Sequence, residues 1–218
     1  MFIGHFAVGF VTKRYAPQTS LGTLVAAAVL LDLLWPVFVL LGWEQVRIDP
    51  GNTAFTPLDF VSYPISHSLV GAFGWATLFA VLYYIFKGYR AGAVLIWIGV
   101  LSHWLLDFVT HRPDMPLYPG GPRLGLGLWN SIPATVLVEG LMFAIGAWIY
   151  LRVTRAKDRI GIWAWWAYVV ALAIFYVANI LSPPPPGVRP MVIAAIPFTW
   201  LLILWAWWAD RHREARSA

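Results

Sequence analysis

Six long apolar stretches restrict what this chain can fold into more than any other feature of its sequence. Each has about the length of an α-helix that crosses a lipid bilayer. We expect membrane spans near residues 21–42, 65–87, 91–110, 131–151, 160–181 and 190–209. Charged residues make up 11% of the chain, whereas a soluble domain contains roughly 25%. The sequence therefore predicts an all-α polytopic membrane protein with about six transmembrane helices.

The first residues are also apolar but do not form another span. Met1–Val11 is too short to cross a bilayer and precedes the basic pair Lys13-Arg14. We predict a short N-terminal half-helix that dips into the membrane, or an interfacial helix. A secretory signal peptide is not predicted, because a basic start and a small-residue cleavage site are missing. We treat residues 1–218 as a single transmembrane domain, in which 1–150 form a metal-site region and 151–218 a two-helix, Trp-rich scaffold.

The distribution of basic residues predicts the orientation. In a six-span chain, eleven Lys and Arg residues fall on one side and four on the other. The positive-inside rule then places both termini in the cytoplasm. The basic residues lie in short loops without interleaved aromatic residues, which argues against a nucleic-acid surface. We expect an integral protein of a prokaryotic inner or plasma membrane, in contact with membrane lipid and anchored by Trp163–Trp166 and Trp205–Trp208 at the interface.

Polar, metal-binding side chains interrupt the third predicted span. His103, Asp107 and His111 recur at i, i+4 and i+8. On a helix they project from one side, each about 40° around from the last. Ionisable groups at membrane depth are costly, and they usually face a cavity, a partner or a metal. Three such groups on one face are the main indication of function.

Further ionisable residues are predicted to reach the same outer half of the membrane. Asp32 lies past the middle of the first span, and His67 lies close to the outer start of the second. Glu139 lies about 12 Å deep in the fourth span, at a rise of about 1.5 Å per residue. His5 joins them if the N-terminal segment dips inward. No basic residue lies inside a predicted span to neutralise these groups, which favours a bound metal or a proton pathway over ordinary ion pairs.

The chemistry of these side chains suits a divalent metal. The chain has no cysteine, so a metal would be held by imidazole and carboxylate groups, with Zn²⁺ favoured and Mn²⁺ or Fe²⁺ as alternatives. The excess of donors indicates one to three ions, or one ion with additional acid–base residues. The predicted metal ligands are His5, Asp32, His67, His103 and Asp107.

Four further residues are assigned roles around this site. His111 and Glu139 are predicted to be either additional ligands or the general acid and base. Arg112 and Arg123, in the adjoining loop, are predicted to bind the anionic headgroup of a substrate. The alternative for both arginines is that they are ordinary loop charges.

The residues around these ligands resemble a known family. The chain contains Leu31-Asp32, Ile65-Ser66-His67-Ser68 and Ser102-His103-x-x-x-Asp107. These segments are similar to the Pro-Asp, Thr-His-Ser and Ser-His-x-x-x-Asp motifs of membrane-bound, metal-dependent hydrolases, also described as LexA-binding, inner membrane-associated hydrolases. The resemblance covers roughly residues 1–150. It departs from the family pattern at Leu31 and Ser66, neither of which replaces a candidate ligand. The resemblance implies a hydrolase that depends on a metal.

A more distant similarity links the ligand order to zinc-dependent phospholipase C and related nucleases. Their order of His, Asp, His and then His-x-x-x-Asp is similar to that of His5, Asp32, His67 and His103-x-x-x-Asp107. Those enzymes are soluble and cleave phosphoesters with a cluster of zinc ions. This similarity implies phosphoester hydrolysis in preference to amide hydrolysis.

These observations predict a membrane-embedded hydrolase that acts on a phosphoester of a lipid or lipid-linked substrate, from a cavity open to the outer side. The alternative is a transporter or channel that moves a metal ion or protons through the same side chains. A conduit needs polar groups along its whole depth, whereas the cytoplasmic halves of the predicted spans are nearly free of charge. A non-catalytic scaffold would leave the buried carboxylates unexplained.

Overall fold

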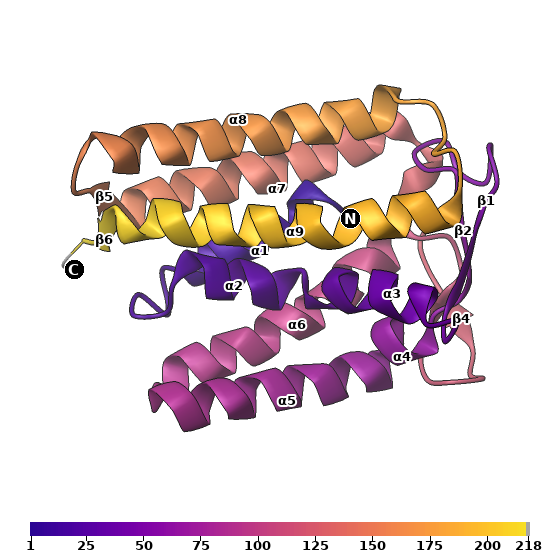
Figure 1. Ribbon diagram of the computed structural model, residues 1–218, viewed down its shortest axis with the longest axis horizontal. Helices are drawn as coiled ribbons and strands as arrows, with labels where there is room; N and C mark the ends of the chain where they lie inside the picture. The colour runs from indigo at the N-terminus through magenta and orange to yellow at the C-terminus, as the bar shows by residue number, and fades with distance from the viewer. Residues whose placement is uncertain (217–218) are drawn as a thin grey trace.

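The computed structural model describes residues 1–216 and is built almost entirely of helices (Figure 1). In chain order the helices are α1 (Ile3–Thr12), α2 (Leu21–Ala28), α3 (Leu30–Leu40), α4 (Pro64–His67), α5 (Leu69–Lys87), α6 (Arg90–Thr110), the 3₁₀-helix η1 (Leu128–Asn130), α7 (Ile132–Val153), α8 (Arg159–Leu181) and α9 (Val188–Arg211). Within the described residues, α5 to α9 are five helices long and apolar enough to cross a membrane, and α2 with α3 makes a sixth, bent span. The predicted all-α polytopic architecture is confirmed.

Three short antiparallel strand pairs lie at the two ends of the helical bundle. β1 (Gln45–Ile48) pairs with β2 (Leu58–Ser62), and β3 (Met115–Pro116) pairs with β4 (Arg123–Leu124). Both pairs lie at the same end of the molecule (Figure 1), in segments that the sequence predicted only as loops. At the opposite end, β5 (Thr154–Ala156) pairs with β6 (Arg213–Ala215), so the segment after α9 is bound to the α7–α8 connection.

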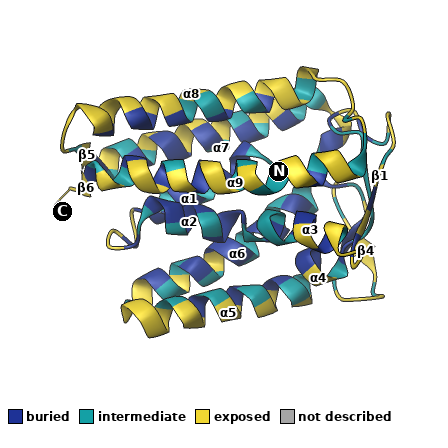
Figure 2. Cartoon of the chain, viewed as in Figure 1, coloured by how far each residue is buried: buried dark blue, intermediate teal, exposed yellow. Residues whose placement is uncertain are grey.

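The long helices run roughly side by side along the molecule. α7, α8 and α9 form one part of the bundle and α5 and α6 another, with α2 and α3 between them (Figure 1). Exposed residues gather on the outward faces of α5, α8 and α9 (Figure 2). Many of these exposed residues are large and apolar, such as Phe86, Trp163 and Leu201. In a membrane protein such faces meet lipid, because lipid chains are as apolar as the side chains themselves.

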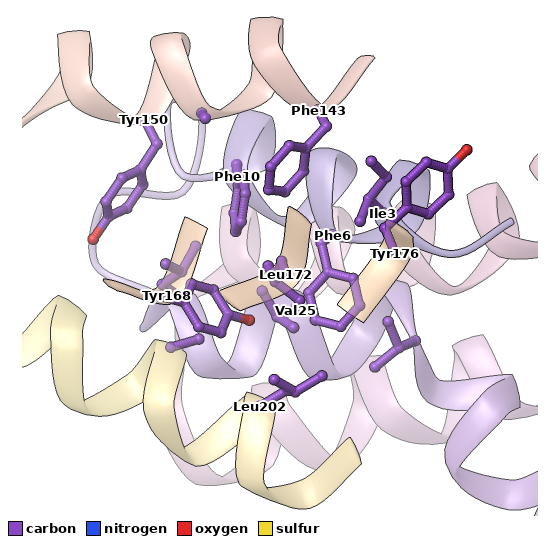
Figure 3. Close-up of a cluster of buried hydrophobic side chains, with 14 of the residues drawn as sticks. Ile3, Phe6, Phe10, Val25, Phe143, Tyr150, Tyr168, Leu172, Tyr176 and Leu202 are labelled. Carbon is purple, nitrogen blue, oxygen red and sulfur yellow. The ribbon is translucent and has the colours of Figure 1, made fainter. Parts of the chain in front are cut away.

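α1 is the predicted half-helix, and it lies inside the bundle. Two glycines allow its close packing: a Cβ on Gly9 would lie 2.9 Å from a methyl group of Val25 on α2, and one on Gly146 of α7 would lie 2.9 Å from the carbonyl oxygen of Ala7. Small residues at such contacts let helix backbones approach closely in membranes. Figure 3 shows Phe6 and Phe10 of α1 surrounded by side chains from the neighbouring helices. The short N-terminal helix is therefore part of the core.

The first predicted span is broken rather than continuous. α2 and α3 meet at an angle of 56° at Val29, whose φ of −111° and ψ of 16° are not helical. Pro36 lies inside α3 and has no backbone N–H to donate to the carbonyl of Asp32. The predicted span near 21–42 is therefore present as two helices joined at a bend. Because the helix breaks here, the backbone carbonyl of Ala28 is available to accept a hydrogen bond from a side chain of another helix.

A buried ion pair joins four helices near the end that carries β5 and β6. Lys13 Nζ lies 2.8 Å from Asp210 Oδ2, with both side chains less than one-tenth exposed. The other carboxylate oxygen of Asp210 accepts a hydrogen bond from the Tyr150 hydroxyl at 2.7 Å, and the backbone N–H of Leu21 donates to Oδ2 at 2.9 Å. This network fixes α1, α2, α7 and α9 against one another.

One of the predicted interfacial tryptophans is a core residue. Trp163 is 71% exposed, as expected of a membrane anchor, but Trp165 is fully buried. Its ring packs against Tyr150 at a centroid distance of 4.2 Å and against Phe10 at 5.0 Å. The prediction that both Trp-rich stretches are membrane anchors was therefore wrong for Trp165. This side chain of α8 points into the bundle, where it packs against α1.

Candidate metal centre

Five of the predicted ligands converge from four helices. His5 comes from α1, Asp32 from the first turn of α3, His67 from the end of α4, and His103 and Asp107 from α6. They form two groups of three, and within each group the ligand atoms lie within 4.8 Å of one another. The first group contains His5, His103 and Asp107, and the second contains Asp32, His67 and His103. The structure thus brings together residues that are up to 102 positions apart in the sequence.

Four ligand atoms, one each from Asp32, His67, His103 and Asp107, form what we call the four-atom site. His103 Nε2 lies 3.0 Å from Asp107 Oδ2 and 3.6 Å from Asp32 Oδ1. His67 Nε2 lies 3.6 Å from the same Asp32 oxygen and 3.8 Å from Asp107 Oδ2. A tetrahedral zinc ion with bonds of about 2.0–2.1 Å holds its ligand atoms about 3.3 Å apart. Asp32, His67 and His103 therefore suit one divalent ion, and Asp107, which belongs to the other group of three, lies beside them.

The protonation of His103 is fixed by the break between α2 and α3. His103 Nδ1 donates a hydrogen bond to the Ala28 carbonyl at 2.8 Å, so we assign the proton of the neutral ring to Nδ1. Nε2 then carries no proton, and its lone pair faces Asp107 and Asp32. Among residues 1–216 this buried atom has no hydrogen-bond partner. A lone pair and a carboxylate repel unless a cation, a metal ion or a proton, lies between them. This orientation of a histidine is typical of a metal ligand.

His67 is oriented in the same way by a chain of hydrogen bonds. The Ser66 hydroxyl donates to Glu44 Oε2 at 2.6 Å. Because that hydroxyl has one proton, its oxygen accepts from Nδ1 of His67 at 2.7 Å, which leaves Nε2 unprotonated toward the two aspartates. Glu44 Oε1 also accepts from the backbone N–H groups of Ile65 and Ser66 at 2.8 and 2.7 Å. A carboxylate–hydroxyl–histidine chain thus supports the ligand.

The sequence prediction missed Glu44. It lies just before β1 in a polar segment, where an acidic residue has no reason to be singled out, yet the structure buries it almost completely. The only sequence signal was the Ser66-His67 pair, because a hydroxyl next to a ligand histidine is a frequent supporting group. Its partner 22 residues earlier could be found only from the fold.

His5 reaches the site from α1. Its Nε2 lies 3.1 Å from Asp107 Oδ1, the oxygen that faces away from His67 and His103. Its ring stacks on that of His103 at a centroid distance of 3.7 Å and an interplanar angle of 4°. The amino group of Met1 also contacts Asp107 Oδ1 and lies 3.4 Å from the Thr110 hydroxyl. Asp107 therefore joins the four-atom site to the first turn of α1.

Glu139 contacts α1 rather than the four-atom site. This fully buried residue of α7 accepts hydrogen bonds through Oε2 from the backbone N–H groups of Phe2 and Gly4, at 2.8 and 3.1 Å. A carboxylate at this position satisfies the free amides of a helix N-terminus and complements the helix dipole. Oε1 has no hydrogen-bond partner within the described residues. Glu139 is thus placed to hold the helix that bears His5.

His111 lies outside both ligand groups. α6 ends at Thr110, and His111 has extended backbone angles, so the i, i+4, i+8 alignment stops before it. Its Nδ1 lies 2.9 Å from Asp114 Oδ1 and 3.4 Å from the Tyr63 hydroxyl, and its ring packs against Trp129 at 4.3 Å. The backbone forms this turn because the Gly127 N–H donates to the His111 carbonyl. The predicted common face therefore holds only for His103 and Asp107.

The two loop arginines are bound to neighbouring protein groups. Arg112 forms ion pairs with Asp59 on β2 and with Asp114, the latter at 3.4 Å. Arg123 donates to the Val61 carbonyl at 2.8 Å and lines a cavity of about 180 Å³ with Tyr63 and Asp114. Neither residue belongs to the two ligand groups. A headgroup-binding role for them stays a prediction.

Asp32 is the most exposed of the five predicted ligands. Its side chain is 43% exposed, whereas those of His5, His67, His103 and Asp107 are at most 5% exposed. Asp32 lines a cavity of about 540 Å³ whose walls include α3, α8 and α9. A small molecule in this cavity would reach the cluster from the side of Asp32.

Comparison with known proteins identifies the family. No curated protein and no solved structure matches the chain. The model of one family, the YdjM inner membrane protein family, matches residues 1–182, which include all five predicted ligands, Glu44, Glu139 and the whole of α8. This match extends beyond the region of resemblance in the sequence, and together with the apolar helices it makes the chain an integral inner-membrane protein. The chain belongs to the YdjM inner membrane protein family.

Proposed function

We propose that this protein is a membrane-embedded, metal-dependent hydrolase that cleaves a phosphoester of a lipid or lipid-linked substrate. The main support is the arrangement of His67 and His103, whose Nδ1 protons are committed elsewhere while both Nε2 atoms face carboxylates. Buried histidines and carboxylates at these distances suit a divalent ion such as Zn²⁺, with Mn²⁺ or Fe²⁺ as alternatives. The resemblance to metal-dependent hydrolases points in the same direction.

Each residue has a distinct part in this proposal. Asp32, His67, His103 and Asp107 hold the ion. When bound, the ion supplies Lewis acidity, which polarises a phosphoryl oxygen and lowers the pKa of water toward neutrality. His5 Nε2, next to the second oxygen of Asp107, is placed to hold or accept a proton. This chemistry needs no Ser or Cys nucleophile, and the chain has no cysteine.

Glu139 and His111 have weaker claims to act in acid–base chemistry than His5. The hydrogen bonds of Glu139 to the first backbone amides of α1 favour a positioning role. His111 directly follows α6, where it is bonded to Asp114 and packed between the aromatic rings of Phe60 and Trp129. Its part in catalysis stays a prediction that a His111→Ala variant would test by turnover at unchanged metal content.

The location of the site supports a lipid substrate. The cluster lies in the half of the bundle that carries β1–β2 and β3–β4, and the basic residues gather at the opposite end. By the positive-inside rule the site then faces the non-cytoplasmic side. A substrate that is held in the bilayer by its own apolar part brings its headgroup to this depth.

The first test is the metal content of detergent-purified protein, prepared without chelators. The wild type is compared with His103→Ala/Asp107→Ala by elemental analysis. His212→Ala serves as the matched control, because His212 lies after α9 and contacts Asp158, far along the chain from the cluster. We expect at least one equivalent of zinc, manganese or iron in the wild type and the control, and its loss in the double variant.

The outcome decides between the two candidate functions. Metal in the wild type, lost in the double variant, justifies a screen of phospholipids and soluble phosphoesters such as p-nitrophenyl phosphate. Equal metal in all three proteins contradicts the assignment of the ligands. Absence of metal from the wild type would favour the alternative, a proton or ion pathway through the same side chains, and flux assays in liposomes would follow.

A further inference from the structure

The cavity beside Asp32 is lined by residues of several elements. Asp32, whose side chain is partly exposed, lines it together with Met1 and Phe2 of the N-terminal segment. Asn179 and Ser182, which are exposed near the end of α8, also line it. The cavity therefore adjoins both the candidate metal centre and the start of the α8–α9 connection.

Apart from Asp32, Asn179, Ser182, Thr56 and Thr199, the lining residues are apolar. One face of α9 supplies Met191, Ala195, Phe198 and Leu202, which are spaced four, three and four residues apart. Such spacing places side chains in a row along one side of a helix. Phe175 of α8 packs edge-to-face on Phe198 at a centroid distance of 4.9 Å. A row of this kind forms a lining several residues long, directed toward the cluster.

The volume and position of the cavity restrict its occupant. About 540 Å³ falls within the range of sites for small molecules, and such sites are mostly apolar with a few polar groups that fix orientation. Part of its wall belongs to α8 and α9, which cross the membrane, and part to the β1–β2 hairpin and η1, through Phe55, Phe60 and Trp129. Exchange of a lipid chain between bilayer and cavity costs little, because both are apolar. An elongated, apolar molecule with one polar end suits a lining that is largely apolar and that includes Asp32.

We propose that this cavity binds an aliphatic chain of the lipid substrate, with the chain along the row on α9 and the phosphoester at Asp32. This assignment rests on the proposed hydrolase function and adds where the apolar part of the substrate lies. The cavity then determines which lipids are cleaved, because the length that it accommodates limits how deeply a headgroup reaches the cluster.

The test uses a phosphatidic acid probe with a photoreactive diazirine at the end of one acyl chain, in mixed micelles with the purified protein. Labelled peptides are mapped by mass spectrometry. We expect labelling of the cavity row on α9 and of Phe175 in the wild type. Ala195→Trp should reduce it about tenfold or more, because the indole occupies the space that the chain needs. Ala194→Trp is the matched control, since Ala194 is exposed and lies outside the cavity lining.

A second pair of variants tests the other wall independently, in case Ala195→Trp fails to fold. Ala178→Trp narrows the cavity from α8, whereas Val177→Trp adds the same side chain on the lipid-facing surface. Equal labelling of Ala178→Trp and Val177→Trp would overturn the proposal. Equal labelling by a diazirine hydrocarbon without a phosphate would also overturn it, because the cavity would then hold chains without regard to the headgroup.

Activity measurements keep this proposal distinguishable from the proposed function. The control Ala194→Trp should leave hydrolysis of a long-chain phosphatidic acid and of p-nitrophenyl phosphate unchanged, whereas Ala195→Trp should slow hydrolysis of the long-chain lipid. Hydrolysis of the long-chain lipid at the wild-type rate by this variant would refute the cavity assignment while the hydrolase function stands. Labelling of the cavity without hydrolysis of any phosphoester would refute the hydrolase function while the chain-binding site stands.

Discussion

The hydrogen-bond chain behind His67 gives a prediction whose size can be worked out from the structure. Ser66→Ala removes a hydroxyl that is fully buried and bonded on both sides, to Glu44 Oε2 at 2.6 Å and to His67 Nδ1 at 2.7 Å. The variant leaves a carboxylate oxygen without that donor and a ring N–H without its acceptor. Each buried group left unpaired costs about 1–3 kcal/mol.

Much of this cost falls equally on the metal-free and metal-bound protein and does not change metal affinity. The part that changes affinity is the loss of orientation and basicity of the His67 ring. Outer partners of ligand histidines typically contribute about 10- to 100-fold in affinity, or about 1.4–2.8 kcal/mol. We therefore expect Ser66→Ala to raise the dissociation constant for Zn²⁺ by about 10- to 100-fold.

The assay is a competition titration with a chromophoric chelator in detergent, at fixed pH. Ser68→Ala is a matched control, because Ser68 is equally buried and two residues away, but its hydroxyl accepts only from the Gly71 N–H at the start of α5. Loss of that cap should lower stability by about 0.5–2 kcal/mol and leave metal affinity unchanged. Ser66→Thr keeps a hydroxyl and should keep the affinity. A Ser66→Ala protein that binds Zn²⁺ like the wild type, or a Ser68→Ala protein weakened to the same extent, would refute the reasoning.

Three further predictions concern other parts of the molecule. Glu139→Ala leaves two backbone amides of α1 unpaired, at about 1–3 kcal/mol each, so hydrogen exchange of residues 3–12 should accelerate; unchanged exchange would argue against a positioning role. Asp210→Asn leaves Lys13 as a buried, uncompensated charge and should destabilise the protein by about 3–5 kcal/mol, with recovery in Lys13→Met/Asp210→Asn as measured by thermal unfolding in detergent. The hydrogen bond from His212, followed by that from a backbone N–H, lowers the pKa of Asp158. Because the folded-state pKa is below the unfolded one, near 4, the contact stabilises the β5–β6 end above that pH. The protection of the β6 amides against hydrogen exchange should therefore decrease as the pH falls through the folded-state pKa of Asp158. Asp158→Asn should remove this change in protection.

The spans and the core of the ligand set were predictable from the sequence, because both depend on local properties. The preference of a side chain for lipid or water belongs to that residue, so a run of apolar residues marks a helix wherever it packs. Asp32 and Asp107 stand out for the same reason, since a carboxylate in an apolar run is costly in any arrangement. Hydropathy could not reveal the bend at Val29, which adds no polar residue and leaves the length of the apolar stretch unchanged.

The path of the chain at His111 shows where helical periodicity fails. Spacing placed it on the face of His103 and Asp107, but spacing applies only while the helix continues. The helix ends one residue earlier, and the returning loop donates from Leu126 to the Phe108 carbonyl and from Gly127 to that of His111. These contacts join residues 16 to 18 positions apart. A helical period cannot predict them.

The sequence by itself therefore determined the membrane-spanning architecture and predicted His5, Asp32, His67, His103 and Asp107 as metal ligands. For His5 this prediction depended on whether the N-terminal segment enters the protein, and tertiary structure decided that point, since burial of α1 depends on the fit of its surface between α2 and α7. It also decided the role of Glu44, an unremarkable loop residue until the chain folds it against Ser66. The physical reason is that hydrophobicity is a property of each residue, whereas a hydrogen bond between distant residues exists only once the backbone has brought both atoms within about 3 Å of each other.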